Sequence, residues 1–182
     1  MIHAFPCGTL PLDFVGTLRA RRNPEPLEKF AAPGDVSAWF MEAGMIDDAP
    51  PAGDADLQRA VEVRERIYAL LDASLHGTPL LADDVAFVNE VAAGSPVRLE
   101  LSDGTVRRSG TIADGLGSLA RETIAILGSP DAALLRECAR PECTQVYLDR
   151  SRGHRREWCS MKTCGNRMKA TAFRERRREA AA

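Results

Sequence analysis

Four cysteines near the C-terminal end of the chain have the spacing of a metal site. Cys138 and Cys143 form one C-x4-C pair, Cys159 and Cys164 form a second, and fifteen residues separate the two pairs. Two close pairs joined by a hairpin-sized insert are a common way to build a tetrahedral site with four sulfur ligands. Because all four positions are thiolates, no position is left for water, and we predict a closed structural site rather than a catalytic one.

Zinc is the ion that we predict here, although other states of the four cysteines stay open at this point. An iron–sulfur cluster uses the same ligands, four unliganded thiols are a second alternative, and disulfides are disfavoured in a reducing compartment. The four-residue spacing lies at the long end of the range usual for zinc fingers. Residues 138–182 are too few to bury a core of their own, so the binding of structural Zn²⁺ would supply their folding energy.

The charge of the sequence changes sign at about the same place. Residues 136–182 contain 13 Lys and Arg against six Asp and Glu, a formal charge of +7. Residues 1–135 contain 11 and 20, a formal charge of -9. We therefore predict two domains, 1–135 and 136–182, of which the second should attract polyanions.

The basic residues of the second domain lie between the cysteine pairs and after them, and we expect them to contact nucleic acid. The candidate residues are Arg150, Arg152, Arg155, Arg156, Asn166, Arg167, Lys169, Arg174, Arg177 and Arg178. Arginine matches phosphate with two hydrogen bonds, and Arg and Asn also read base edges in the major groove of DNA. The alternative is structural: the same side chains would neutralise the thiolates or pair with Asp149 and Glu157.

The elements that must position these residues are mainly helical. Apolar periodicity and capping residues predict helices over residues 35–43, 55–74, 83–93 and 114–127, with Asp35 and Asp114 as caps. A short helix should run from about Asp13 through Leu18 and Arg19, and another should start at Asp131 and lead to the first cysteine. After the last cysteine, residues 166–178 lack Pro and Gly and predict a basic helix. Its apolar stripe of Met168, Ala172 and Phe173 should lie on the cysteine knuckle.

Strand signals are few. Val97–Leu101 alternates apolar and charged residues, Thr105–Arg107 does so less cleanly, and the Asp103-Gly104 pair between them predicts a hairpin turn. Val146–Leu148 is also typical of a strand. The predicted fold class is mainly α with a small β-hairpin: a helical N-terminal domain, then a small C-terminal zinc-finger domain with four cysteine ligands that ends in a basic helix.

Several functional classes are disfavoured by what the sequence lacks. No apolar stretch approaches the ~20 residues of a membrane span, and the first residues do not resemble a secretory leader, so we expect a cytoplasmic protein without membrane contact. No phosphate-binding loop, nucleophile elbow or HExxH motif is present, so we expect no enzymatic activity. Asp13, Arg19 and Trp39 are our candidates for a small-molecule pocket, although for Trp39 we favour packing in the core over a pocket role.

Several motifs of the chain resemble those of a known family. The resemblance to the CGNR zinc finger is carried by Cys138-Ala-Arg-Pro-Glu-Cys143, Tyr147–Arg152, Arg156-Glu157-Trp158-Cys159 and Cys164-Gly165-Asn166-Arg167. Upstream, Leu12-Asp13-Phe14-Val15-Gly16-Thr17 is similar to the Leu-Asp-Phe-Val-Asn-Thr signature of the ABATE domain. Gly16 stands where that signature has Asn.

The resemblance implies a bacterial transcription regulator, sometimes described as stress-induced. Our leading hypothesis is that the zinc domain binds double-stranded DNA while the acidic domain senses a small-molecule effector, a partner or its own copy in a homodimer. A second hypothesis is an RNA-binding zinc protein, although the scarcity of aromatic residues (5%) argues mildly against base stacking on single strands. A third is a protein-interaction module that docks an acidic partner.

Overall fold

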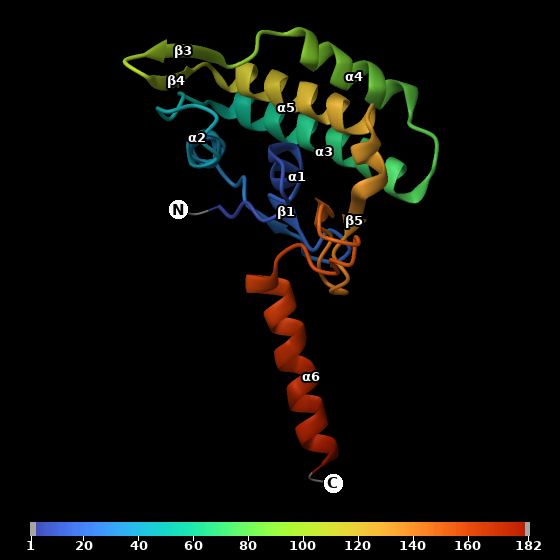
Figure 1. Cartoon of the computed structure of the whole chain (residues 1–182). Coiled ribbons are helices and arrows are strands. Elements are labelled where there is room, and N and C mark those ends of the chain that lie inside the picture. The colour runs from blue at the N-terminus through green and yellow to red at the C-terminus, as the bar shows by residue number, and fades with distance from the viewer. Residues whose placement is uncertain (1–2, 181–182) are drawn as a thin grey trace.

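The computed structural model describes residues 3–180, in which a layer of helices is followed by a small cysteine-rich segment and a projecting terminal helix (Figure 1). The helices are α1 (Leu10–Val15), α2 (Pro33–Glu42), α3 (Asp54–His76), α4 (Ala82–Ala93), α5 (Ile112–Leu127), the 3₁₀-helix η1 (Pro130–Leu134), the π-helix η2 (Met161–Gly165) and α6 (Asn166–Glu179). The strands form antiparallel pairs: β1 (Leu18–Arg19) with β2 (Leu27–Glu28), β3 (Arg98–Ser102) with β4 (Thr105–Ser109), and β5 (Leu135–Glu137) with β6 (Val146–Leu148). The predicted fold class is confirmed.

Helices α3, α4 and α5 pack against one another and form the main layer of the molecule (Figure 1). The long helix α3 turns one apolar stripe inward, as its periodicity predicts. The buried members of that stripe are Ala60, Val63, Ile67, Leu70 and Leu71. On α5, Gly115 permits close contact with α2, because a Cβ at this position would overlap the ring of Phe40.

A cluster of aromatic rings joins the N-terminal segment to this layer. The ring of Trp39 lies 5.1 Å from that of Phe14, 5.3 Å from Phe40 and 5.7 Å from Phe5, measured between centroids. Phe14, Trp39 and Phe40 are fully buried. The interpretation of Trp39 as a core residue is therefore correct, and the residue also lines a small cavity described below.

Two helices begin earlier than predicted, because the aspartates taken as caps act from inside the first turn. Asp35 lies at the third helical position of α2, where its carboxylate accepts a hydrogen bond of 2.8 Å from the N–H of Ala32. Asp114 does the same in α5 and accepts a 2.8 Å bond from the N–H of Thr111. Thr111 is the actual N-cap, and the pair forms a capping box.

The first helix was predicted to run through Leu18 and Arg19, and this prediction is wrong. Helix α1 ends at Val15, where the hydroxyl of Thr17 donates a 2.7 Å hydrogen bond to the carbonyl of Phe14. Leu18 and Arg19 then pair with β2 as a short strand. The buried guanidinium of Arg64 fixes this turn, since it donates to both carboxylate oxygens of Glu28, at 2.6 and 2.7 Å.

The helix predicted to start at Asp131 is also wrong. The segment forms the short η1, capped by Ser129, and then strand β5. The segment pairs with β6 instead of continuing as a helix, because this pairing places Leu135 opposite Leu148 and buries both side chains. The N–H of Leu148 also donates a 3.3 Å hydrogen bond to the carbonyl of Cys7, so this strand pair packs on the N-terminal segment.

Helix α6 forms where it was predicted, but it does not lie on the cysteine knuckle. Figure 1 shows it projecting away from the other helices, and none of its residues is buried. Phe173 is 54% exposed, and Met168 and Ala172 are only half-buried. Only the first half of α6, from Arg167 to Arg174, lines a cavity shared with the loop of the first cysteine pair, so most of its surface is open to a partner.

We call residues 3–135 the body and residues 136–180 the finger. Strand β5 spans this boundary, so the division into two independent domains stays a prediction, and residues 1–2 and 181–182 of the predicted ranges lie outside the described residues. No helix among residues 3–180 combines the length and apolar character needed to cross a bilayer.

Candidate functional site

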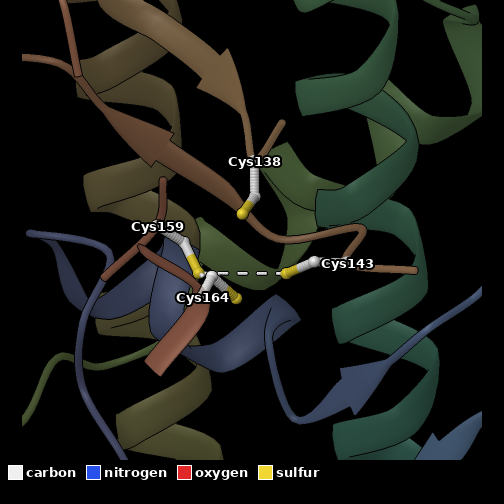
Figure 2. Close-up of side chains that lie close together, drawn as sticks. All are labelled: Cys138, Cys143, Cys159 and Cys164. Carbon is white, nitrogen blue, oxygen red and sulfur yellow. Dashed lines mark hydrogen bonds between the residues drawn. The ribbon is translucent and has the colours of Figure 1, made fainter. Parts of the chain in front are cut away.

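The four predicted ligands converge on one point of the finger. The sulfur atoms of Cys138, Cys143, Cys159 and Cys164 all lie within 4.8 Å of one another (Figure 2). The sulfur of Cys159 is 3.8 Å from that of Cys143 and 3.6 Å from that of Cys164. All but the half-exposed Cys143 are buried. The sequence therefore predicted the complete set of ligands.

Local backbone turns hold each pair of cysteines in place. The first pair follows β5, where the N–H of Cys138 donates 3.0 Å to the carbonyl of Gln145 and the N–H of Cys143 donates 2.8 Å to that of Arg140. Cys159 ends an irregular segment, and Cys164 lies in η2. The N–H of Ala139 donates 2.8 Å to the carbonyl of Glu157, which ties the two halves of the site together.

The geometry fits a zinc ion with four thiolate ligands. Four sulfurs at the usual Zn–S distance of about 2.3 Å on a tetrahedron lie about 3.8 Å apart, close to the separations found here. Hydrogen bonds among the thiols lower the pKa of Cys138 and raise the pKa values of Cys143 and Cys159. Thiolates this close together repel one another, and a divalent cation would supply the positive charge that keeps all four deprotonated. The site is a structural Zn²⁺ site, and the ion would cross-link the two halves of the finger without an open coordination position.

Most of the predicted nucleic-acid-binding residues lie on the surface of the finger. The exposed members are Arg150, Arg152, Arg155, Asn166, Arg167, Lys169, Arg174, Arg177 and Arg178. The guanidinium of Arg150 is already engaged, at 2.6 Å, by the carboxylate of Asp131. Whether these residues bind nucleic acid stays a prediction; the structure places them where a partner can reach them.

Arg156 differs from the other candidates because its guanidinium is used inside the molecule. It donates to the carbonyl of Pro6 at 2.9 Å, to that of Trp158 at 2.8 Å and to that of Cys159. It also stacks on the ring of Tyr147, 4.5 Å from the centroid. Arg156 therefore links the N-terminal segment to a metal-binding loop, and its guanidinium is not available to a nucleic acid.

The basic and acidic residues of α6 lie on opposite sides of the helix. At about 100° per residue, its six cationic residues fall within an arc of roughly 200°, whereas its two acids fall on the opposite side. The basic side holds Arg167, Lys169, Arg174, Arg176, Arg177 and Arg178, together with Asn166 and Phe173. The other side holds Glu175 and Glu179 with Met168 and Ala172. Arg176 was not among the residues predicted from the sequence, although its position on the basic side of the helix would have indicated it.

The three residues predicted to form a small-molecule pocket are brought together. Asp13, Arg19 and Trp39 line one narrow cavity of about 10 Å³, room for about one water molecule, with His3 and Lys29 among its other walls. The indole Nε1 of Trp39 and the Nε2 of His3 have no hydrogen-bond partner. Burial raises the pKa of Asp13 to about 6, although its carboxylate accepts a 2.9 Å bond from the N–H of Cys7. His3 was assigned no role from the sequence, because nothing local marks it.

Gly16, the position that departs from the ABATE signature, lies against the finger. A Cβ at Gly16 would overlap the side-chain nitrogen of Gln145, which is buried and has no hydrogen-bond partner of its own. The amide of Gln145 thus fills the space next to Gly16 from the finger side. An Asn at position 16 would require Gln145 to move.

Comparison with known families gives two matches that together cover most of the chain. The ABATE family, described as "Putative stress-induced transcription regulator", matches residues 8–130. The CGNR zinc finger matches residues 135–177 and so includes all four cysteines. No curated protein matches the chain.

Proposed function

Since the chain belongs to the ABATE family of transcription regulators and carries a CGNR zinc finger, we propose that it regulates transcription by binding duplex DNA through α6. The observation that carries this proposal is the projecting α6, which has no fully buried residue and has its cations on one side. A helix fits the major groove of B-DNA, and α6 is about 21 Å long. We propose no enzymatic activity, because the cysteine site is closed.

The two parts of the finger would have different tasks in this complex. Arg167, Arg174 and Arg178 lie on one line along α6 and would neutralise phosphates, whereas Asn166 and Arg177 lie nearer the middle of the basic side and would face base edges. Arg152 and Arg155, on the exposed loop before Cys159, would add phosphate contacts. The zinc site would hold the loop and the helix in a fixed relation, so that both meet the same duplex.

The salt dependence of duplex binding tests this proposal. With about 4–6 phosphate contacts, the logarithm of the binding constant should fall with the logarithm of salt concentration at a slope of about -4 to -5. The double variant Arg174→Glu/Arg178→Glu should lose most of the affinity and reduce the slope by about 2, since each contact contributes about one. A slope near zero for the unmodified protein would contradict the proposal.

A matched control separates a local interface from a general effect of charge. Arg107→Glu/Arg108→Glu makes the same change of charge on the β3–β4 hairpin, at the far end of the body from α6 (Figure 1). This control should bind DNA with nearly unchanged affinity. Equal losses in the two double variants would show that only net charge matters and would remove α6 from the interface.

RNA binding is the alternative that the same charges allow. Competition between duplex DNA and a structured RNA of equal length distinguishes the two, because an α-helix enters the wide major groove of B-DNA but not the deep, narrow groove of A-form RNA. Preference for RNA would replace the DNA proposal. Weak binding to both, without sequence preference, would favour the protein-interaction hypothesis.

A further inference from the structure

A cleft of about 320 Å³ lies between the body and the finger, beside the metal site. The body contributes the β1–β2 connection, from Arg19 to Leu27. The finger contributes the loop of the first cysteine pair, from Arg140 to Gln145, and the segment around Cys164, from Thr163 to Arg167. A cleft of this size and position is typical of the sites where two parts of a protein hold a small molecule.

The cleft is rich in guanidinium groups. Arg19, Arg140 and Arg167 line it, and the one carboxylate in its wall, that of Glu142, is already paired with Arg140 at 2.5 Å. Arg19 donates one long bond of 3.4 Å to the carbonyl of Gly16. For Arg167, no hydrogen bond or ion pair is present within the described part of the chain. The wall therefore has donors left over for an anion.

The metal site explains only part of this charge. A zinc ion with four thiolates carries a net charge of -2, and Arg140 is the guanidinium in contact with it, 4.0 Å from the sulfur of Cys164. Arg19 and Arg167 make no such contact with a thiolate. Two of the three guanidinium groups are thus available to a ligand.

A buried amide without a partner points to the same place. Gln145 lines the cleft, is only 5% exposed, and its side-chain nitrogen makes no hydrogen bond. Leaving such a donor unsatisfied costs free energy, so a buried amide normally has an acceptor close by. On the other side of Arg19 lies the narrow cavity of Trp39 and His3, where the Nε1 of Trp39 and the Nε2 of His3 also lack partners. The side-chain nitrogen lies against Gly16, so Gln145 would turn its amide toward the cleft to donate to an oxygen-rich anion bound there.

We propose that this cleft binds a small organic anion bearing a carboxylate or phosphate group, held by the guanidinium groups of Arg19 and Arg167 and the amide of Gln145. The anion would bridge the body and the start of α6, and it would occupy Arg167. On the premise that α6 binds DNA as proposed above, the bound anion would therefore weaken binding to the duplex, because it removes one phosphate contact.

Titration of the zinc-loaded full chain with inorganic phosphate, and separately with succinate, tests the site. Sodium chloride keeps the ionic strength constant, and no DNA is present. We expect a saturable shift of one nuclear magnetic resonance signal, the side-chain amide of Gln145, whereas the indole N–H of Trp39, which lines the separate narrow cavity, should shift much less. The chain has two tryptophans, so Trp158→Phe identifies the Trp39 signal.

Three variants make the test specific. Arg19→Gln and Arg167→Gln, which alter the two opposite walls, should each weaken the anion about tenfold, the loss expected for one charge-assisted hydrogen bond. Arg107→Gln, on the distant hairpin, should bind as the unmodified protein does. Because Arg167 is exposed, its variant stays informative even if Arg19→Gln fails to fold.

The proposal is overturned if the shifts rise linearly without saturation, if they are confined to the signals of α6, or if Arg167→Gln binds as tightly as the unmodified protein. A separate measurement of duplex affinity with and without saturating succinate tests the regulatory consequence. Since the titration contains no DNA, loss of the DNA-binding proposal leaves the anion site standing, and the reverse also holds.

Discussion

The body and the finger of this protein are stabilised in different ways. In the body, Phe14, Trp39 and Phe40 are fully buried and their rings pack edge to face or tilted. In the finger, strand β6 joins this core, but the buried side chains around the metal site are cysteines, and α6 has no fully buried residue. Apolar burial therefore holds the body and strand β6, whereas the metal ion holds the loops that carry α6.

Loss of a zinc ligand should produce the largest change in stability, and this change should be confined to the finger. Structural zinc contributes about 10–16 kcal/mol in isolated zinc-finger peptides, so Cys159→Ala should release the ion and unfold residues 138–165. Helices α2–α5 should persist, because their core does not contain the metal, although the segment around Cys7 should loosen. Zinc content and amide hydrogen exchange provide the measurement. Loss of protection throughout α3 and α5 would show that the two regions fold as one unit.

Truncation of a phenylalanine in each region sharpens the comparison. Phe14→Ala leaves a cavity in the aromatic cluster and should lower the free energy of unfolding by about 3–5 kcal/mol. Phe173→Ala makes the same chemical change on the exposed side of α6 and should cost less than about 0.5 kcal/mol. Urea unfolding followed by circular dichroism measures both. Similar costs for the two variants would mean that α6 packs against the rest of the chain in solution.

The change at Asp13 should have a smaller effect than Phe14→Ala, and its direction depends on pH. Burial raises the pKa of Asp13 from 3.8 to about 6, so the folded protein holds this proton more tightly than the unfolded chain does. The stability that protonated Asp13 contributes is therefore fully present below about pH 4, and it is lost as the pH rises through about 6. Asp13→Asn keeps an acceptor for the N–H of Cys7 and cannot ionise. It should raise the free energy of unfolding at about pH 8 by about 1–3 kcal/mol.

Unfolding experiments over roughly pH 5.5–8 check this prediction in a range where the zinc thiolates stay bound. The gain from Asp13→Asn should shrink as the pH falls. Asp103→Asn, in the exposed hairpin turn, is the matched control and should follow the unmodified protein at every pH. A constant difference between Asp13→Asn and the unmodified protein would show that the carboxylate of Asp13 is well solvated in the folded state.

The parts of the molecule that depend on local sequence were predictable. The four ligands follow from cysteine spacing, and the β3–β4 hairpin follows from Asp103-Gly104, which have the positive φ values of 49° and 75° that such a turn requires. The long amphipathic α3 was found within two residues at each end. In each case the signal lies in neighbouring residues or in a regular repeat.

The parts that depend on distant partners were not predictable. Strand β5 is three residues long and forms because Val146–Leu148 lies beside it, which no periodicity in Leu135–Glu137 indicates. Arg156 resembles its neighbouring arginines in sequence, yet a carbonyl 150 residues away takes up its guanidinium. The cleft between body and finger is likewise formed by three segments that only the tertiary structure brings together.

The bonds from Arg156 to Pro6 and from Leu148 to Cys7 have a consequence for how the chain is made. Pro6 and Cys7 are synthesised well before Leu148 and Arg156, so these two bonds can form only after the finger has left the ribosome. Because Arg156 also donates to the carbonyl of Cys159, the binding of zinc by a new molecule would help to complete the packing of its N-terminal segment.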